Sequence, residues 1–123
     1  MNEPEFSFAL PVLNGAASLE RTLRSLQAQS LESIQVIVAD NDSNDETAAV
    51  AKYFAERDSR FRYVHGERVD VNANFARALD YVESDYVAWA AHDDVWHPDF
   101  AGRVLDELKA GYQVVIPNWW IGD

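Results

Sequence analysis

The stretch Tyr86–Trp96, YVAWAAHDDVW, joins a mostly apolar run to a pair of acids and decides the fold class. The run does not alternate between apolar and polar residues, which is typical of a parallel strand covered on both faces. Asp93 and Asp94 follow it closely. Parallel strands bring their carboxyl ends to the edge of the sheet where α/β proteins bind ligands. Because hard oxygen ligands suit Mg²⁺ or Mn²⁺, the pair predicts a divalent cation that holds a phosphate group.

A second acidic cluster, residues 40–45 (DNDSND), follows the apolar run Ile34–Ala39. Taken alone, Asp93 and Asp94 could be ordinary loop acids, one of them helping to start the helix after Pro98. Two clusters in equivalent places, each directly after a strand, favour one shared polar crevice instead.

The remaining periodicity completes an alternation of strands and helices. Helical faces are predicted around Leu19, Val50, Phe75 and Val104, and further strands at Phe6–Val12, Phe61–Val64 and Gln113–Ile116. This alternation predicts a Rossmann-like, mostly parallel α/β sheet of about five strands with helices on both faces. The expected strand order is 3-2-1-4 with the fifth strand beyond, so that Asn14, Asp40, Asp93 and Asp94 face a crevice between the first and fourth strands.

Composition narrows the possible classes of function. The 123 residues carry a net charge of -11, which argues against binding nucleic acid or an anionic membrane through a basic face. A polyanionic ligand would also be repelled unless backbone N–H groups, an arginine or a cation reverse the local field. The absence of cysteine excludes disulfides and Cys-based zinc sites. With no signal-like start and no apolar run of about 20 residues, we expect a cytoplasmic protein without a transmembrane segment.

Five motifs in order resemble the nucleotide-binding half of a family 2 glycosyltransferase with the GT-A fold. They are PVLNG at residues 11–15, VADNDSNDET at 38–47, NFARAL at 74–79, SDYVAW at 84–89 and AHDDVWHP at 91–98. The resemblance runs from about Phe6 to about Pro117. Any one motif is weak, but their common order and spacing are specific.

The resemblance implies binding of a nucleotide-sugar donor, of the UDP type, and inverting, metal-dependent transfer of its sugar to a hydroxyl acceptor. Asp40 occupies the place of the acid that recognises the base, and a carboxylate can accept a hydrogen bond from a uracil N–H. Asp93 and Asp94 occupy the place of the residues that hold Mg²⁺ or Mn²⁺. The nucleotide-sugar site that the resemblance implies comprises Pro11, Asn14, Asp40, Asp42, Asn74 and Asp93.

Two departures from the family pattern bear on catalysis. Ala91 stands where many relatives carry an acid. Family members also continue into a segment that binds the acceptor and supplies the carboxylate base. The later acids here are Asp99, Asp106, Glu107 and Asp123, and none is expected to deprotonate an acceptor. We therefore expect residues 1–123 to form one glycosyltransferase 2-like domain, truncated before the acceptor-binding segment, that binds a donor without necessarily transferring it.

Two alternatives from other classes of protein are also compatible with the sequence. A receiver-like signalling domain also binds Mg²⁺ with acids at strand ends. Such a domain is expected to carry a lysine after the fifth strand, where this chain has Pro117. A non-catalytic remnant that scaffolds a partner is the other. Among single residues, His92 is the weaker candidate for a metal ligand. We expect Arg68 to be a solvated loop residue rather than a phosphate partner, and we expect Trp89 to lie in the core.

Overall fold

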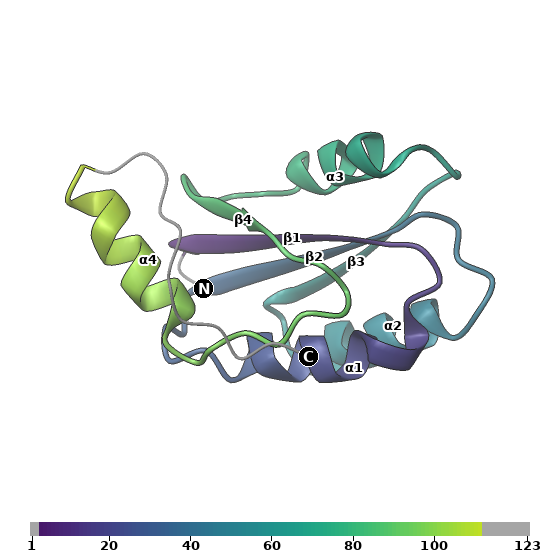
Figure 1. The fold of residues 1–123 in the computed structure, drawn as a ribbon, viewed down its shortest axis with the longest axis horizontal. Coiled ribbons are helices and arrows are strands. Elements are labelled where there is room, and N and C mark those ends of the chain that lie inside the picture. The colour runs from purple at the N-terminus through teal and green to yellow at the C-terminus, as the bar shows by residue number, and fades with distance from the viewer. Residues whose placement is uncertain (1–2, 112–123) are drawn as a thin grey trace.

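A computed structural model describes residues 3–111 as a four-stranded parallel sheet with helices on both faces (Figure 1). The elements are β1 Phe6–Val12, α1 Ala16–Gln27, β2 Ile34–Asp40, α2 Thr47–Arg57, β3 Phe61–His65, α3 Val71–Leu79, β4 Val87–Trp89 and α4 Phe100–Lys109. The strand order is β3-β2-β1-β4, and every pairing is parallel. The predicted order of the first four strands is confirmed, whereas the predicted fifth strand, Gln113–Ile116, lies outside the described residues.

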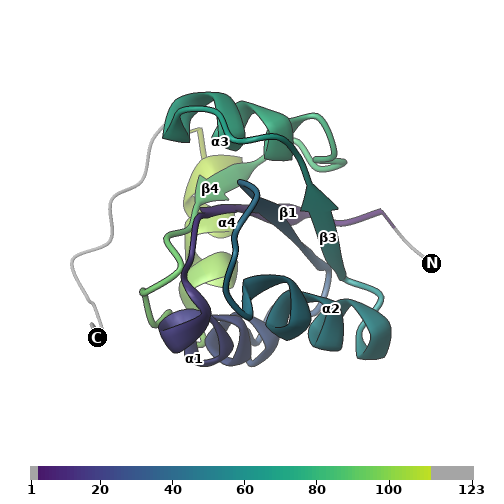
Figure 2. The ribbon, with the colours of Figure 1, turned by 90° about the vertical axis from the view of Figure 1, so that its right-hand side faces the viewer.

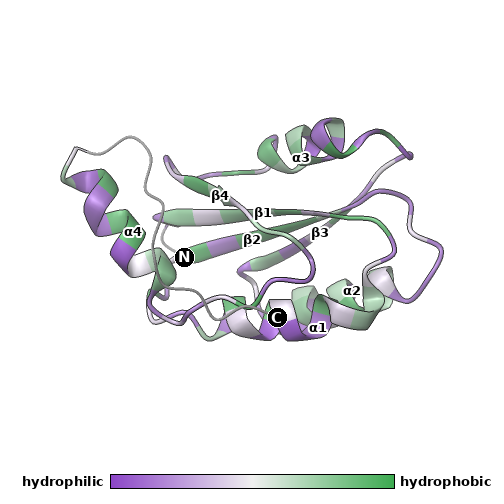
Figure 3. Cartoon of the chain, in the orientation of Figure 1, coloured by the Kyte–Doolittle hydropathy of each residue, from purple (hydrophilic) through white to green (hydrophobic). Residues whose placement is uncertain are grey.

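The sheet separates two apolar layers (Figure 2). Helices α1 and α2 cover one face, where Leu23 and Phe54 meet Phe8 of β1 in the larger core cluster, and α4 joins that cluster through Leu105. Helix α3 covers the opposite face, where Ala78 packs in a cluster with Ile37 of β2. The apolar stripes of the helices turn toward the sheet and their polar stripes turn outward (Figure 3).

β1 and β2 are buried along their whole length because they are the two central strands and both of their faces are covered. β4 is short and lies at the edge of the described sheet. The expectation that Trp89 belongs to the core is therefore wrong: it is 44% exposed and stacks flat on Phe75, with ring centroids 4.0 Å apart.

A side chain just before α3 fixes where this helix begins. Helix α3 begins at Val71 with Asp70 as its N-cap. The Asp70 carboxylate accepts a hydrogen bond from the Ala73 N–H at 2.8 Å, which satisfies one of the free donors of the first turn. Within residues 3–111, every helix is too short or too polar to cross a membrane.

Candidate functional site

The loops that follow β1 and β2 are tied together by Asn14. Its N–H donates to Ser43 Oγ at 2.8 Å, and its side-chain Oδ1 accepts from the Asn44 N–H at 2.9 Å. Asn14 has a φ of 54°, in the left-handed region that asparagine tolerates better than most residues. The structure thus places Asn14 after β1, where its hydrogen bonds link the two loops.

The same β2–α2 loop supports the start of α1. Asp45 Oδ2 accepts from the Ala16 N–H at 3.2 Å, and Thr47 Oγ1 accepts from the Gly15 N–H at 3.0 Å. Thr47 in turn donates its hydroxyl to Asp45 Oδ1 at 2.6 Å, and this hydrogen bond lowers the pKa of the Asp45 carboxyl. These contacts satisfy N–H groups that a helix start leaves without intrahelical partners.

Asp40 was expected to face the crevice, but its carboxylate is turned into the protein and is 1% exposed. Oδ2 accepts from the Tyr63 hydroxyl at 2.6 Å, and Oδ1 accepts from the Ser43 N–H at 3.0 Å. Burial, followed by the hydrogen bond and negative charge of Asp40, raises the pKa of Tyr63. Strand alternation explains the direction, because Asp40 continues the face of β2 that carries Val36 and Val38 toward α2. Asp40 therefore holds the turn after β2.

Asn41, which the sequence reasoning did not single out, fixes the loop before α3. Its Nδ2 donates to the Val69 carbonyl at 2.7 Å, and its Oδ1 accepts from the Val69 N–H at 2.8 Å. Arg68 donates to the carbonyl oxygens of Asn41 and Asp42 at 3.2 and 3.1 Å, so its guanidinium group stabilises the loop after β2. The Asp42 carboxylate lies 2.9 Å from His65 Nε2 on the exposed rim.

A hollow of about 240 Å³ opens where these segments meet. Residues that line it include Pro11, Leu13, Asn41, Val69, Asn74 and His92. The neighbours of both acidic clusters, Asn41 beside Asp40 and His92 beside Asp93, therefore border one space. None of the four residues expected to face a common crevice, Asn14, Asp40, Asp93 and Asp94, is among the residues that line this hollow.

Asn74 lies in the wall of the hollow and is 1% exposed. Its Nδ2 donates to the Ala39 carbonyl at 2.8 Å, and its Oδ1 accepts from Arg77 at 3.0 Å. Asn74 therefore holds α3 against the end of β2 and helps to shape the hollow.

Three hydroxyl side chains on α1 anchor the segment that carries the acid pair. Ser18 and Thr22 both donate to the His92 carbonyl oxygen, at 2.9 and 2.8 Å, and Ser25 Oγ accepts from the Trp96 N–H at 3.0 Å. Positions 18, 22 and 25 follow helical spacing, so the three hydroxyls share one face of α1. Asp93 is exposed and Asp94 is half-buried between these anchors.

The donor chemistry of Asp93 and Asp94 is compatible with a divalent cation. Among residues 3–111, no three acidic or histidine side chains converge as a metal cage. Mg²⁺ is commonly bound by one or two carboxylates and completes its shell with water and substrate phosphates. Asp93 and Asp94, which follow the last residue of β4 by four and five positions, supply carboxylates of the kind that such a site uses.

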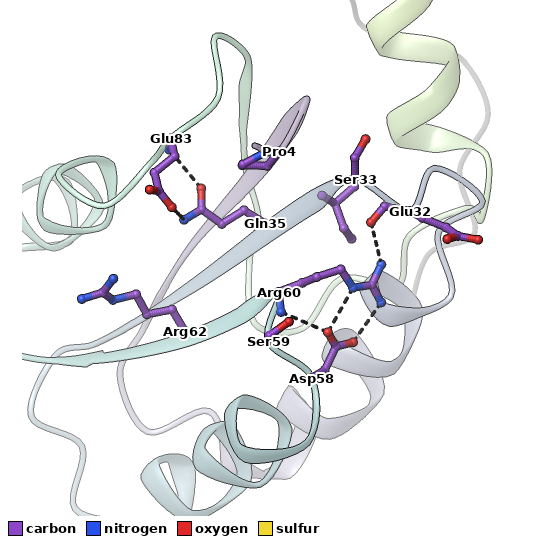
Figure 4. A pocket seen from close by; sticks show the side chains of 10 residues that line it. Pro4, Glu32, Ser33, Gln35, Asp58, Ser59, Arg60, Arg62 and Glu83 are labelled. Carbon is purple, nitrogen blue, oxygen red and sulfur yellow. Dashed lines mark hydrogen bonds and ion pairs between the residues drawn. The ribbon is translucent and has the colours of Figure 1, made fainter. Parts of the chain in front are cut away.

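A larger hollow, of about 510 Å³, lies at the opposite edge of the sheet (Figure 4). Its charged groups are mostly paired with protein atoms: Arg60 binds Asp58 at 2.9 Å, and Glu83 accepts from Gln35 at 3.3 Å. The Arg62 guanidinium lies over the Tyr81 ring, 4.4 Å from its centroid. Size alone does not make this hollow the functional site, because ligand sites of open α/β sheets lie at the carboxyl ends of the strands.

The model of a protein family described as Glycosyl transferase family 2 matches residues 7–123. The chain belongs to this family. The GalNAc(5)-diNAcBac-PP-undecaprenol beta-1,3-glucosyltransferase of Campylobacter jejuni is 26% identical over 117 residues, which are 94% of this chain and 38% of that protein. The chain spans about a third of the length of such curated relatives. Family membership leaves no support for the receiver-like alternative.

Solved glycosyltransferases share the fold of this family 2 chain. S. aureus TarS in complex with UDP-GlcNAc superposes with a TM-score of 0.68 at 22% identity, over 84% of this chain and 31% of TarS. The mannosyltransferase PcManGT of Pyrobaculum calidifontis, in complex with GDP-Man and Mn²⁺, gives 0.73 at 20% identity, over 88% and 33% of the two chains. These likenesses confirm the GT-A fold expected from the sequence.

Proposed function

We propose that this chain is the donor-binding part of a metal-dependent glycosyltransferase that takes a nucleoside diphosphate sugar of the UDP type. The observation that carries the proposal is the hollow at the carboxyl edge of the sheet, which is bordered by Asn41 after β2 and by His92 beside the acid pair. Membership of family 2 and the nucleotide-sugar complexes of the structural neighbours TarS and PcManGT support it.

The proposed roles follow from where each side chain lies. Pro11 and Asn74 form part of the wall that receives the nucleoside, and Asn14 joins the two loops that flank it. Asp40 and Asp42 act through the turn after β2, because the Asp40 carboxylate is internal and that of Asp42 pairs with His65.

Asp93 and Asp94 would hold a divalent cation, which neutralises diphosphate charge as the sugar leaves. This role answers the electrostatic problem of the chain, since a net charge of -11 opposes an approaching diphosphate. A cation held by these two carboxylates would supply the positive charge that a diphosphate needs at this place. We place transfer to a hydroxyl acceptor, with inversion, in the same proposal.

Among residues 3–111, three acids follow the acid pair and were considered as the base that would activate the acceptor. Asp99, Asp106 and Glu107 lie on or beside α4, and none of them lines the hollow. We therefore assign donor and cation binding to residues 3–111, and we assign the base of the transfer step to none of these three acids.

Isothermal titration calorimetry with UDP, in the presence and absence of Mn²⁺, tests the proposal. The wild-type protein is expected to bind UDP more tightly with Mn²⁺, and the double variant Asp93→Asn, Asp94→Asn is expected to lose that difference. Asp106→Asn and Glu107→Gln together, on the exposed side of α4, provide a control with the same change in charge. Equal enhancement by Mn²⁺ in the wild type and in the Asp93, Asp94 variant would contradict the proposed cation site.

A further inference from the structure

The loop between β3 and α3, residues 66–70, forms one side of the hollow together with the start of α3. Val69 of this loop and Asn74 of α3 both line the hollow. The loop has no regular secondary structure, and all of its residues except Gly66 are exposed. Because burial of apolar side chains contributes little to holding such a segment, its position depends on hydrogen bonds to its neighbours.

Arg77 of α3 joins this loop to the helix. Its Nη2 donates to the Glu67 carbonyl oxygen at 2.7 Å, and its Nη1 donates to Asn74 Oδ1 at 3.0 Å. A planar guanidinium group holds two acceptors in a fixed geometry, so the two contacts position the loop and the Asn74 amide relative to each other. Asn74 is 1% exposed, so loss of Arg77 would leave its buried oxygen without this donor.

Gly66 makes room for the guanidinium group. A Cβ built on Gly66 would lie only 2.1 Å from Arg77 Cζ and 2.2 Å from Nη1. The φ of Gly66 lies outside the left-handed region, so the backbone itself could accept alanine. The guanidinium group ends a flexible side chain, and it would move away from such a Cβ. An alanine at this position would therefore remove Arg77 from its place between Glu67 and Asn74.

We infer that Arg77 is a positioning residue for nucleotide binding, an inference that rests on the proposed donor-binding function. Arg77 is not among the residues that line the hollow, so it acts through Val69 and Asn74. Its guanidinium group holds both parts of this wall in one arrangement before a nucleotide arrives. A wall that is already ordered raises affinity, because binding does not have to order it.

Calorimetry with UDP and Mn²⁺ on Arg77→Ala, Gly66→Ala and the double variant tests this role. Each single variant is expected to bind UDP about three- to tenfold more weakly than the wild type, because each loses the same hydrogen bonds. The double variant should bind as each single variant does, since a Cβ at position 66 then has no guanidinium group to displace. Arg103→Ala, at an exposed arginine of α4, is the control with the same change in charge and should keep wild-type affinity.

NMR of the protein without nucleotide provides a readout that does not depend on binding. The backbone amide resonance of Val69 and the side-chain amide resonance of Asn74 should shift in Arg77→Ala and in Gly66→Ala. The backbone amide of His92, which borders the hollow from the segment after β4, should stay in place. Thermal unfolding establishes that each variant is folded at the temperature of the titration.

Two results would overturn the inference alone. Wild-type affinity for UDP in folded Arg77→Ala, even with a lowered Tm, would show that Arg77 has only a structural role. Losses that add in the double variant would show that Gly66 and Arg77 do not act through one contact. If the wild-type protein itself does not bind UDP, the proposed function fails and the positioning role fails with it. The two failures are distinguishable, because the first requires a wild type that binds.

Discussion

The buried carboxylate of Asp40 holds the turn after β2 through its hydrogen bonds, a structural role that its sequence motif does not reveal. The sequence reasoning placed polar residues at the carboxyl edge of the sheet, and Asn14 and Asp42 lie there. It could not show that Asp40 turns inward, because that depends on Tyr63, a partner on another strand. Asn41 and His92 line the hollow. The sequence did not single out Asn41 and gave His92 little weight, because the acids beside them were the stronger candidates for ligand binding.

Loss of the Tyr63 hydroxyl should destabilise the protein. Tyr63→Phe leaves one oxygen of a buried carboxylate without its donor, and a hydrogen bond to a charged group contributes about 1.5–3 kcal/mol. Chemical denaturation should show a loss of this size in the free energy of unfolding. Tyr53→Phe, at an exposed tyrosine of α2, is the matched control and should change little. Equal effects of the two substitutions would argue against a structural role for the Asp40–Tyr63 pair.

Tyr63 should also make stability depend on alkaline pH. Its pKa is raised in the folded state by burial and by Asp40, so its stabilising contribution is complete below the pKa of an unfolded tyrosine, about 10. Above that pH the unfolded chain loses the proton first, and stability falls until the folded pKa is passed. The free energy of unfolding, measured between about pH 8 and pH 11, should decline less steeply in Tyr63→Phe. Parallel profiles for wild type and variant would contradict this assignment.

For helices and strands, hydrophobic periodicity predicted which segments form an element better than it predicted where that element lies in the sheet. β1 and β2 are buried throughout, as continuous apolar runs indicate. The exposure of Trp89 was not predictable, because an apolar run does not reveal whether its strand is central or at an edge of the sheet. The hydroxyl-bearing face of α1 could be recognised in the sequence, because positions 18, 22 and 25 follow helical spacing. Its hydrogen-bond partners could not, because they come from a segment about 70 residues later.

Thr22 is the fully buried member of that face, and its substitution tests the anchor. Thr22→Val keeps the shape and removes the hydroxyl that donates to the His92 carbonyl, so we expect a loss of about 1 kcal/mol in stability. Amide hydrogen exchange at Asp94 and Trp96 should become faster. Arg21→Ala, on the exposed side of the same helix, is the control and should leave exchange there unchanged. Unchanged protection in Thr22→Val would show that the segment is held by other contacts.

For the molecule as a whole, the parallel topology brings distant stretches of sequence to one edge of the sheet. The loops after β1, β2 and β3 and the segment after β4 all start from that edge, and hydrogen bonds from Asn14, Asn41 and α1 fix them together. Topology and the resemblance to a family were predictable from the sequence. The direction of each polar side chain was not, because it depends on partners in other segments.

We propose that a nucleoside diphosphate and a cation bind at the hollow between Asn41 and His92. An amide chemical-shift map of the protein, recorded as UDP and Mg²⁺ are added, shows where they bind. We expect shifts at Leu13, Asn41, Val69 and His92 together, from both sides of the hollow. Shifts confined to Arg60, Arg62 and Glu83, around the hollow at the opposite edge of the sheet, would contradict it.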